Sequence, residues 1–317
     1  MRAASSGRGG ESGVRVAFGW RCTGVAWPGD EPRLGWSKGA ERRVSTLAYG
    51  AGLGFRAVGE RHCVGARGNV CPLGAVVSVR STGARCPECA RLDRAHSVAA
   101  DTLLDDPRTY RVYLAWFGPG LVKVGITREE RGAARLREQG AVVFSWLGRG
   151  PLMAARRTEE VLRAALGVPD RIPYARKRAV RGQLAGEQQR LAEVVELYGR
   201  AAELEGRGWP ESLERLPLDL VDHGGIFGLD RAPRATRSVR ELVDGGVVAG
   251  QLVAAAGPDL HLAVAGGGGG GGGGDVVVLD TRLITGWELA AVDPAAANDV
   301  RVPLIDIGGG GVQGGLF

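Results

Sequence analysis

Lysine is scarce in this chain of 317 residues. Of its 41 cationic side chains only three are lysines, at positions 38, 123 and 177, and the others are arginines. The excess of arginine, alanine, glycine and valine is typical of coding bias, so the net charge of +6 is weak evidence for a nucleic-acid partner. A lysine retained in such a chain is more noticeable, because an unconstrained position would have drifted to arginine. The two residues are not interchangeable, since lysine can lose its proton near neutral pH and arginine cannot.

Long apolar runs and targeting signals are also lacking. No apolar stretch reaches the roughly 18 residues of a membrane span, and residues 1–13 are polar, without the apolar segment of a signal peptide. We therefore expect a cytoplasmic protein with no membrane partner. The chain contains no P-loop, no Rossmann fingerprint and no Ser/His/Asp or Cys/His arrangement. The nine consecutive glycines at 266–274 are expected to form a flexible loop.

Four of the five cysteines lie within residues 60–96 and form two pairs, the second a C-x-x-C. They are Cys63, Cys71, Cys86 and Cys89. In a reducing compartment such thiols are not expected to form structural disulfides, and two pairs are typical of a tetrahedral structural zinc site. His62 or His96 could replace one cysteine as a ligand. The alternatives are unrelated buried thiols or a redox pair, although no βαβ pattern surrounds the C-x-x-C.

Residues 110–141 predict a β-hairpin followed by a basic helix. Two runs rich in β-branched and aromatic residues, 112–117 and 121–126, flank a Gly-Pro-Gly turn. Thr127 is expected to cap a helix that ends at Gly140. The alternative is a surface hairpin with a solvated, arginine-rich helix.

The same segment resembles the core of the GIY-YIG nuclease superfamily. Val112-Tyr113 stands where the family has Ile-Tyr, and Lys123-Val124-Gly125 stands where it has Tyr-Ile-Gly. Arg135 takes the position of the family's arginine, and Glu159 or Glu160 that of its metal-binding glutamate. The longer string KVGITR…R…EQGA is similar to a bacterial branch of this fold known as a domain of unknown function, over most of the chain.

This resemblance implies a divalent-metal phosphodiesterase that acts on DNA or RNA. Glu159 would hold Mg²⁺ or Mn²⁺, Arg135 would stabilise the developing charge, Tyr113 would orient or activate water, and Lys123 would contact phosphate. In the nucleases the second tyrosine helps to position or deprotonate the attacking water. Because Lys123 takes its place, a non-catalytic, zinc-containing nucleic-acid-binding module is the alternative. A protein–protein adaptor is a third, and it predicts no continuous basic groove.

Residues 153–166 predict an amphipathic helix in which Glu159 lies near an apolar stripe of Ala155, Leu162 and Leu166. A carboxylate there is costly unless it is paired or bound to a metal, which favours Glu159 over Glu160 as a ligand. The alternative is an exposed pair of glutamates that balance nearby arginines.

A basic segment, RIPYARKRAVR, follows at residues 171–181. Its cations and its single aromatic are predicted to follow a phosphate backbone and to stack on a base. These residues are Arg171, Tyr174, Arg176, Lys177 and Arg178. A solvated run of charge is the alternative.

The predicted fold class is α+β, with a small GIY-YIG-like core and a β-rich domain built from both ends of the chain. The N-terminal strands alone are too few to bury a face. The expected order is a disordered leader (1–13), an N-terminal β segment (14–59), the zinc module (60–96), the core (97–182), a long helix (183–207), a β-rich segment (208–307) and a flexible tail (308–317).

The tail ends in Gln313-x-x-Leu316-Phe317, after a run of glycines. This pattern resembles the short motif by which bacterial replication and repair proteins bind the DNA sliding clamp, and it implies DNA as the nucleic acid. The alternative is a frayed or locally docked chain end.

Overall fold

The computed structural model describes residues 19–94, 106–169, 171–204, 209–264, 275–297 and 299–308. Several predictions concern residues outside these ranges: the leader (1–13), His96, the glycines at 266–274, and the clamp-like motif of Gln313, Leu316 and Phe317. Within the described residues, helices and strands are mixed, which confirms the α+β class. No helix among them is long and apolar enough to cross a membrane.

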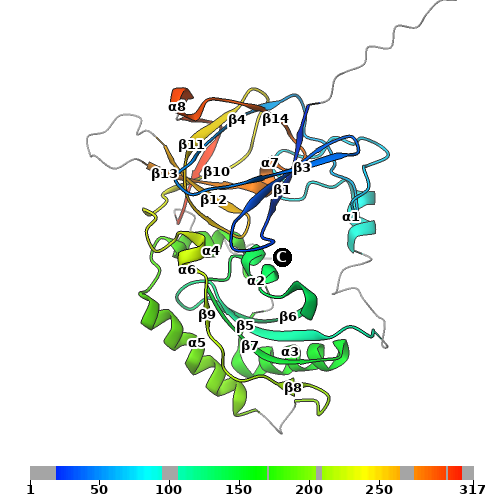
Figure 1. Cartoon of the computed structure of the whole chain (residues 1–317), viewed down its shortest axis with the longest axis vertical. Helices are drawn as coiled ribbons and strands as arrows, with labels where there is room; N and C mark the ends of the chain where they lie inside the picture. Colours follow the sequence, from blue (N-terminus) through cyan, green and yellow to red (C-terminus); the bar gives the residue numbers. More distant parts are fainter. Residues whose placement is uncertain are drawn as a thin grey trace, which may run out of the picture.

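Strands from both ends of the chain share one 11-stranded sheet in the upper half of Figure 1. The N-terminal strands are β1 (Arg21–Ala26), β2 (Arg33–Lys38), β3 (Glu41–Thr46) and β4 (Gly52–Val58). The C-terminal ones are β10 (Arg237–Val239), β11 (Val247–Ala256), β12 (Asp259–Val264), β13 (Asp275–Asp280), β14 (Glu288–Ala291), β15 (Val300–Arg301) and β16 (Leu304–Asp306). Strand β4 pairs with both β11 and β14, so the two ends of the chain interleave. Short helices α7 (Thr281–Ile284) and α8 (Pro294–Ala297) connect the later strands.

A second, five-stranded sheet forms the core below it, in the order β6-β5-β7-β8, with β9 also paired to β7. Its strands are β5 (Tyr110–Trp116), β6 (Val122–Arg128), β7 (Val143–Gly150), β8 (Glu214–Arg215) and β9 (Val221–Asp222). Its helices are η1 (Glu129–Arg131), α2 (Ala134–Gln139), α3 (Leu152–Leu166), α4 (Tyr174–Arg181), α5 (Glu187–Ala202) and α6 (Gly224–Phe227). The predicted hairpin is confirmed as β5 and β6.

The two faces of this core sheet pack against different helices. Val112 and Leu114 of β5 pack with Leu162 of α3 in one cluster of buried residues. Tyr113 and Ala115, which alternate with them, belong to another cluster with Leu136 of α2. Because successive side chains of a strand point to opposite faces, α3 and α2 cover opposite sides of β5.

The helix predicted to start at Thr127 begins later. Thr127 lies inside β6, where it is buried and pairs with Arg111 across the hairpin. A buried β-branched residue fits a strand well, so the chain stays extended there. A 3₁₀ turn then precedes α2, and Gly140 ends α2 with a left-handed backbone, φ 69°, as predicted.

The buried face of the long helix also differs from the predicted one. Apolar residues at helical spacing, Leu184, Leu191, Val195, Tyr198 and Ala202, predict one buried face, but Val195 is 42% exposed. The helix instead buries Arg190, Val194 and Ala201. Arg190 pairs with Asp222 and Asp230, so a buried ion pair shifts the buried face by one residue.

Candidate metal centre and basic groove

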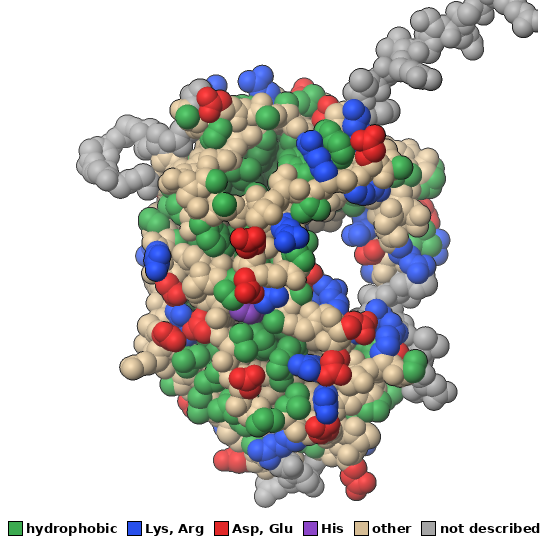
Figure 2. Space-filling view, in the orientation of Figure 1, with side chains coloured by type: hydrophobic (Ala, Val, Ile, Leu, Met, Phe, Trp, Pro, Cys, Tyr) green, Lys and Arg blue, Asp and Glu red, His purple; other side chains and the backbone are tan. Residues whose placement is uncertain are grey.

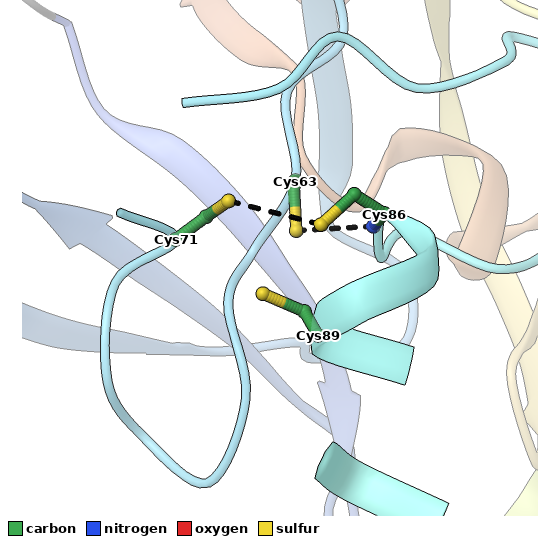
Figure 3. A group of neighbouring side chains, drawn as sticks. All are labelled: Cys63, Cys71, Cys86 and Cys89. Atoms are coloured by element: carbon green, nitrogen blue, oxygen red, sulfur yellow. Dashed lines mark hydrogen bonds between the residues drawn. The ribbon is translucent and has the colours of Figure 1, made fainter. Parts of the chain in front are cut away.

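The four cysteines of residues 60–96 converge on one point, as Figure 3 shows. Their sulfur atoms all lie within 4.8 Å of one another, and the Sγ atoms of Cys71 and Cys86 are 3.9 Å apart. Zn–S bonds of 2.3 Å in a tetrahedron place sulfurs about 3.8 Å apart. The cluster could therefore hold a metal such as zinc, and all five cysteines of the chain are free of disulfides.

Local chemistry of the chain explains this convergence. Helix α1 (Pro87–Arg94) begins with proline, which suits the first helical position, so Cys86 and Cys89 flank its first turn. The backbone N–H of Cys86 donates to the Sγ of Cys63 at 3.2 Å. A hydrogen bond from the backbone N–H of Ala75 is the main reason that the pKa of Cys71 is lowered to about 7. These two hydrogen bonds favour the thiolates of Cys63 and Cys71, the form that binds metal. Burial acts in the opposite direction and raises the pKa of Cys63 and of Cys89, so a bound cation would be needed to hold all four as thiolates.

One buried arginine fixes this cysteine module, residues 60–94, to the large sheet. Arg61 is 1% exposed and donates four hydrogen bonds to backbone carbonyls. Two acceptors, Ser78 and Ser81, are in the module, and two, Arg282 and Thr285, lie in and after α7. The other suggested ligand, His62, instead places its Nδ1 2.8 Å from the carbonyl of Gly74 and lies outside the metal cluster.

Some of the residues that carry the GIY-YIG resemblance, Tyr113, Lys123 and Gly125, lie close together across the hairpin. Tyr113 pairs with Gly125, and a Cβ on Gly125 would lie 2.3 Å from the tyrosine Oη. A glycine is thus required for the tyrosine ring to lie over β6. The Oη is 2.9 Å from the Nε2 of Gln139, and the Nζ of Lys123 is 5.8 Å from the ring centroid. Tyr113 itself is 2% exposed.

Arg135 and Glu159 do not complete a single open site with Tyr113. Arg135 is exposed on α2, and its guanidinium lies 3.6 Å from Glu138. Glu159 belongs to α3, which packs on the opposite face of the sheet from Tyr113. It is half-buried, whereas Glu160 is exposed. Among the described residues, the cysteine cluster is the one group of three or more potential ligands, and Glu159 is not in it.

The basic segment 171–181 is mainly helix α4, and it joins the two sheets. Lys177 is 3% exposed, donates to the carbonyl of Gln139 at 2.9 Å and lies 3.7 Å from the Phe117 ring centroid. Arg178 pairs with Asp259 and Asp280 of the large sheet, at 2.6 and 2.5 Å. The prediction that Lys177 and Arg178 contact a phosphate backbone is therefore wrong, because the terminal nitrogens of both side chains are bonded inside the protein.

The remaining residues of that segment are more accessible. Arg171 and Arg176 are exposed. Tyr174 is half-buried, and the guanidinium of Arg282 lies 4.1 Å from its ring centroid. Its hydroxyl donates to the carbonyl of Glu138 at 3.3 Å. Tyr174 thus stands at the junction of α2, α4 and α7, beside a hollow of the surface.

Two connected hollows form what we call the basic groove. The first, about 470 Å³, lies between the cysteine module and strands β1–β3, and its cations are Arg21, Lys38, Arg42 and Arg85. Among the residues that the structure describes, no carboxylate lines it. The second, about 340 Å³, runs from the module to α2, α4 and α7 and is lined by Arg85, Arg282, Tyr174 and Glu138. Thr23, Val64 and Arg85 line both hollows, so the groove is continuous.

Figure 2 shows this side of the molecule hollowed between the cysteine module and the remainder, with Lys and Arg side chains around the opening. No local pattern indicates that these cations line one groove, because the groove joins segments far apart in the chain. One signal was available for Lys38. It is one of only three lysines, and the scarcity that drew attention to Lys123 applied equally to it.

Comparison with known proteins places the chain in a family. Residues 50–289, more than half of the sequence, match the family described as "Protein of unknown function (DUF2797)", and the chain belongs to that family. The cysteine cluster and helices α2 to α4 lie within the matched residues, whereas Lys38 and Arg42 precede them. No curated protein and no solved structure gives a significant match.

Proposed function

We propose that this protein binds nucleic acid in the basic groove, and that the cysteine cluster holds a zinc ion that stabilises one wall of it. The observation that carries the proposal is the charge of the groove. Among the described residues, two of the five cations that line the hollows are already paired, Arg85 with Asp93 and Arg282 with Asp280, and one carboxylate, Glu138, lines them. That carboxylate already lies 2.6 Å from Arg131 and 3.6 Å from Arg135. A continuous excess of positive charge in a concave surface favours a phosphate backbone as its ligand.

The zinc site itself accounts for part of this charge. Four thiolates around Zn²⁺ carry a net charge of about −2 and are stabilised by nearby cations. Arg85 and Arg282 are already paired with Asp93 and Asp280, so their charge is largely neutralised within the protein. Lys38 and Arg42 are both exposed on the hairpin of β2 and β3, and they are the cations best placed to contact a ligand. The hydrogen bonds of Arg42 go to backbone carbonyls of Gly39, Glu41 and Gly68. An adaptor without nucleic-acid function does not require this groove.

A variant that removes these two charges tests the proposal. Lys38→Gln/Arg42→Gln is expected to weaken binding of an oligonucleotide by about tenfold or more, since each charge-assisted contact contributes roughly 1 kcal/mol or more. Fluorescence anisotropy of a labelled oligonucleotide measures the effect. The matched control is Arg200→Gln/Arg240→Gln, which removes two exposed cations that do not line the groove. Equal affinities of the two double variants would count against the groove.

A GIY-YIG-like endonuclease is the second candidate function, and the placement of Tyr113 over Gly125 favours it. In that form Glu159 would hold Mg²⁺ or Mn²⁺, although the sheet separates its helix from Tyr113. The test is incubation with structured and single-stranded DNA and RNA plus either metal ion. If cleavage occurs, Arg135→Ala should slow it about 100-fold, as loss of one transition-state donor does. If the protein binds these nucleic acids but cleaves none of them with either metal ion, the non-catalytic function is supported.

A further inference from the structure

The second hollow of the groove differs chemically from the first. Trp27, Val25, Pro258 and Tyr174 give it apolar and aromatic walls, and its volume of about 340 Å³ is that of a small-ligand site. The Tyr174 ring is contacted by the guanidinium of Arg282, 4.1 Å from its centroid, and by the Nζ of Lys177, 4.5 Å from it. The guanidinium plane of Arg282, held by Asp280, therefore provides the main stacking surface of the hollow. Guanidinium planes and aromatic rings are the surfaces on which unpaired bases stack.

The first hollow offers charge in place of stacking surfaces. Lys38 and Arg42 are exposed residues of its lining, Arg85 lines both hollows, and no carboxylate of the described part of the chain lines the first. This set suits a phosphate group, which needs cationic donors. The two hollows share Thr23, Val64 and Arg85, so one ligand can occupy both at once.

From these two surfaces we infer that the groove takes an unpaired nucleotide, with a phosphate in the first hollow and its base in the second. The inference rests on the proposed nucleic-acid function and specifies its substrate as a single strand. A duplex keeps its bases stacked inside a rigid cylinder with phosphates outside, so a base reaches a recessed pocket only when it is unpaired or flipped out. A duplex could touch the cations at the edge of the first hollow and leave the second hollow empty.

Binding measurements on the full-length, zinc-containing protein separate these cases. Three labelled ligands of equal length, about fifteen nucleotides, are compared: a single-stranded DNA, the same sequence as a blunt duplex, and an abasic strand that retains every phosphate. The single strand is expected to bind about tenfold more tightly than either of the others, because stacking of one or two bases is worth that much.

A variant that fills the second hollow tests whether that hollow binds a base. Gly83 lines it, and a Cβ there would meet only Ser81 Oγ, at 3.4 Å. Gly83→Leu is thus expected to fold normally and to remove the advantage of the single strand over the abasic strand. The control is Gly199→Leu on α5, where a Cβ meets nothing within 4 Å. Circular dichroism and thermal unfolding of both variants verify that they are folded.

The outcomes distinguish failure of the base pocket from failure of the proposed nucleic-acid binding. If the duplex or the abasic strand binds as tightly as the single strand, and Lys38→Gln/Arg42→Gln weakens all three, the groove binds nucleic acid but the base pocket is wrong. Unchanged single-strand affinity in a folded Gly83→Leu also overturns the pocket. If no ligand binds at all, the proposed function and the inference fall together.

Discussion

Replacing Cys86 with serine is expected to unfold the cysteine module and to abolish binding in the groove, while the two sheets stay folded. The module has little else to hold it together. Its buried cluster consists of Cys63, Ala66, Val77, Cys86 and Cys89, so three of its five members are the proposed ligands. For a module of this kind, metal binding supplies most of the folding free energy, about 10 kcal/mol or more for structural zinc. Chelation should have the same effect as the substitution.

Two measurements check this prediction. Elemental analysis should find about one zinc per chain in the wild-type protein and much less in Cys86→Ser. Limited proteolysis should cut the module only after chelation or substitution. Cys22→Ala is the matched control, because Cys22 is a buried thiol outside the cluster, with a pKa that burial raises to about 12. A fully folded protein without metal would contradict the account of this site.

Replacing Lys177 with methionine is expected to stabilise the protein. Burial, with help from Arg181 and Lys123, lowers the pKa of Lys177 from 10.5 to about 6. The unfolded chain therefore holds this proton more tightly than the folded one at pH 7, a cost of roughly 5 kcal/mol. Methionine keeps the apolar stem beside Phe117 and loses a hydrogen bond to the carbonyl of Gln139. We expect a net gain of about 3 kcal/mol in the free energy of unfolding.

The gain in the free energy of unfolding should decrease as pH rises. Between the folded pKa, about 6, and the unfolded value, 10.5, the unfolded state binds more protons, so the wild-type protein gains stability as pH rises. The methionine variant lacks this contribution. Its advantage should be greatest at pH 6 and below and, falling by about 1.4 kcal/mol per pH unit, should vanish near pH 9. Asp259, Arg135 and Tyr174 face the same region, and Lys123→Met controls for the loss of a neighbouring charge. Denaturant titrations that give parallel curves for wild type and Lys177→Met would refute this explanation.

Local patterns in the sequence predicted local structure well. The alternating runs around Gly118 and Gly120 became β5 and β6, and the helix predicted at 153–166 is α3. The spacing of the four cysteines also predicted their convergence, because a C-x-x-C pair with a second pair nearby fits one tetrahedral site. These signals depend on residues a few positions apart.

Long-range pairing could not be predicted in this way. The run of cations in α4 predicts solvent exposure or nucleic-acid binding, but the partners of Arg178, Asp259 and Asp280, come some 80 to 100 positions later. Nothing in the local sequence marks such a pairing. For the same reason the sequence does not predict the groove, since only the fold brings Lys38 and Arg282 to its two adjoining hollows. The separation of Glu159 from Tyr113 likewise follows from which face of the sheet α3 covers.

The salt dependence of single-strand binding tests the central claim most directly. If Lys38 and Arg42 contact phosphates, these two contacts should make the logarithm of the association constant fall with the logarithm of salt concentration with a slope of about −1.4. The zinc-containing protein is titrated with single-stranded DNA at several salt concentrations, beside Lys38→Gln/Arg42→Gln. The account predicts that the double variant loses more than half of this slope. Absence of binding at low salt, or a slope that is the same in the variant, would contradict it.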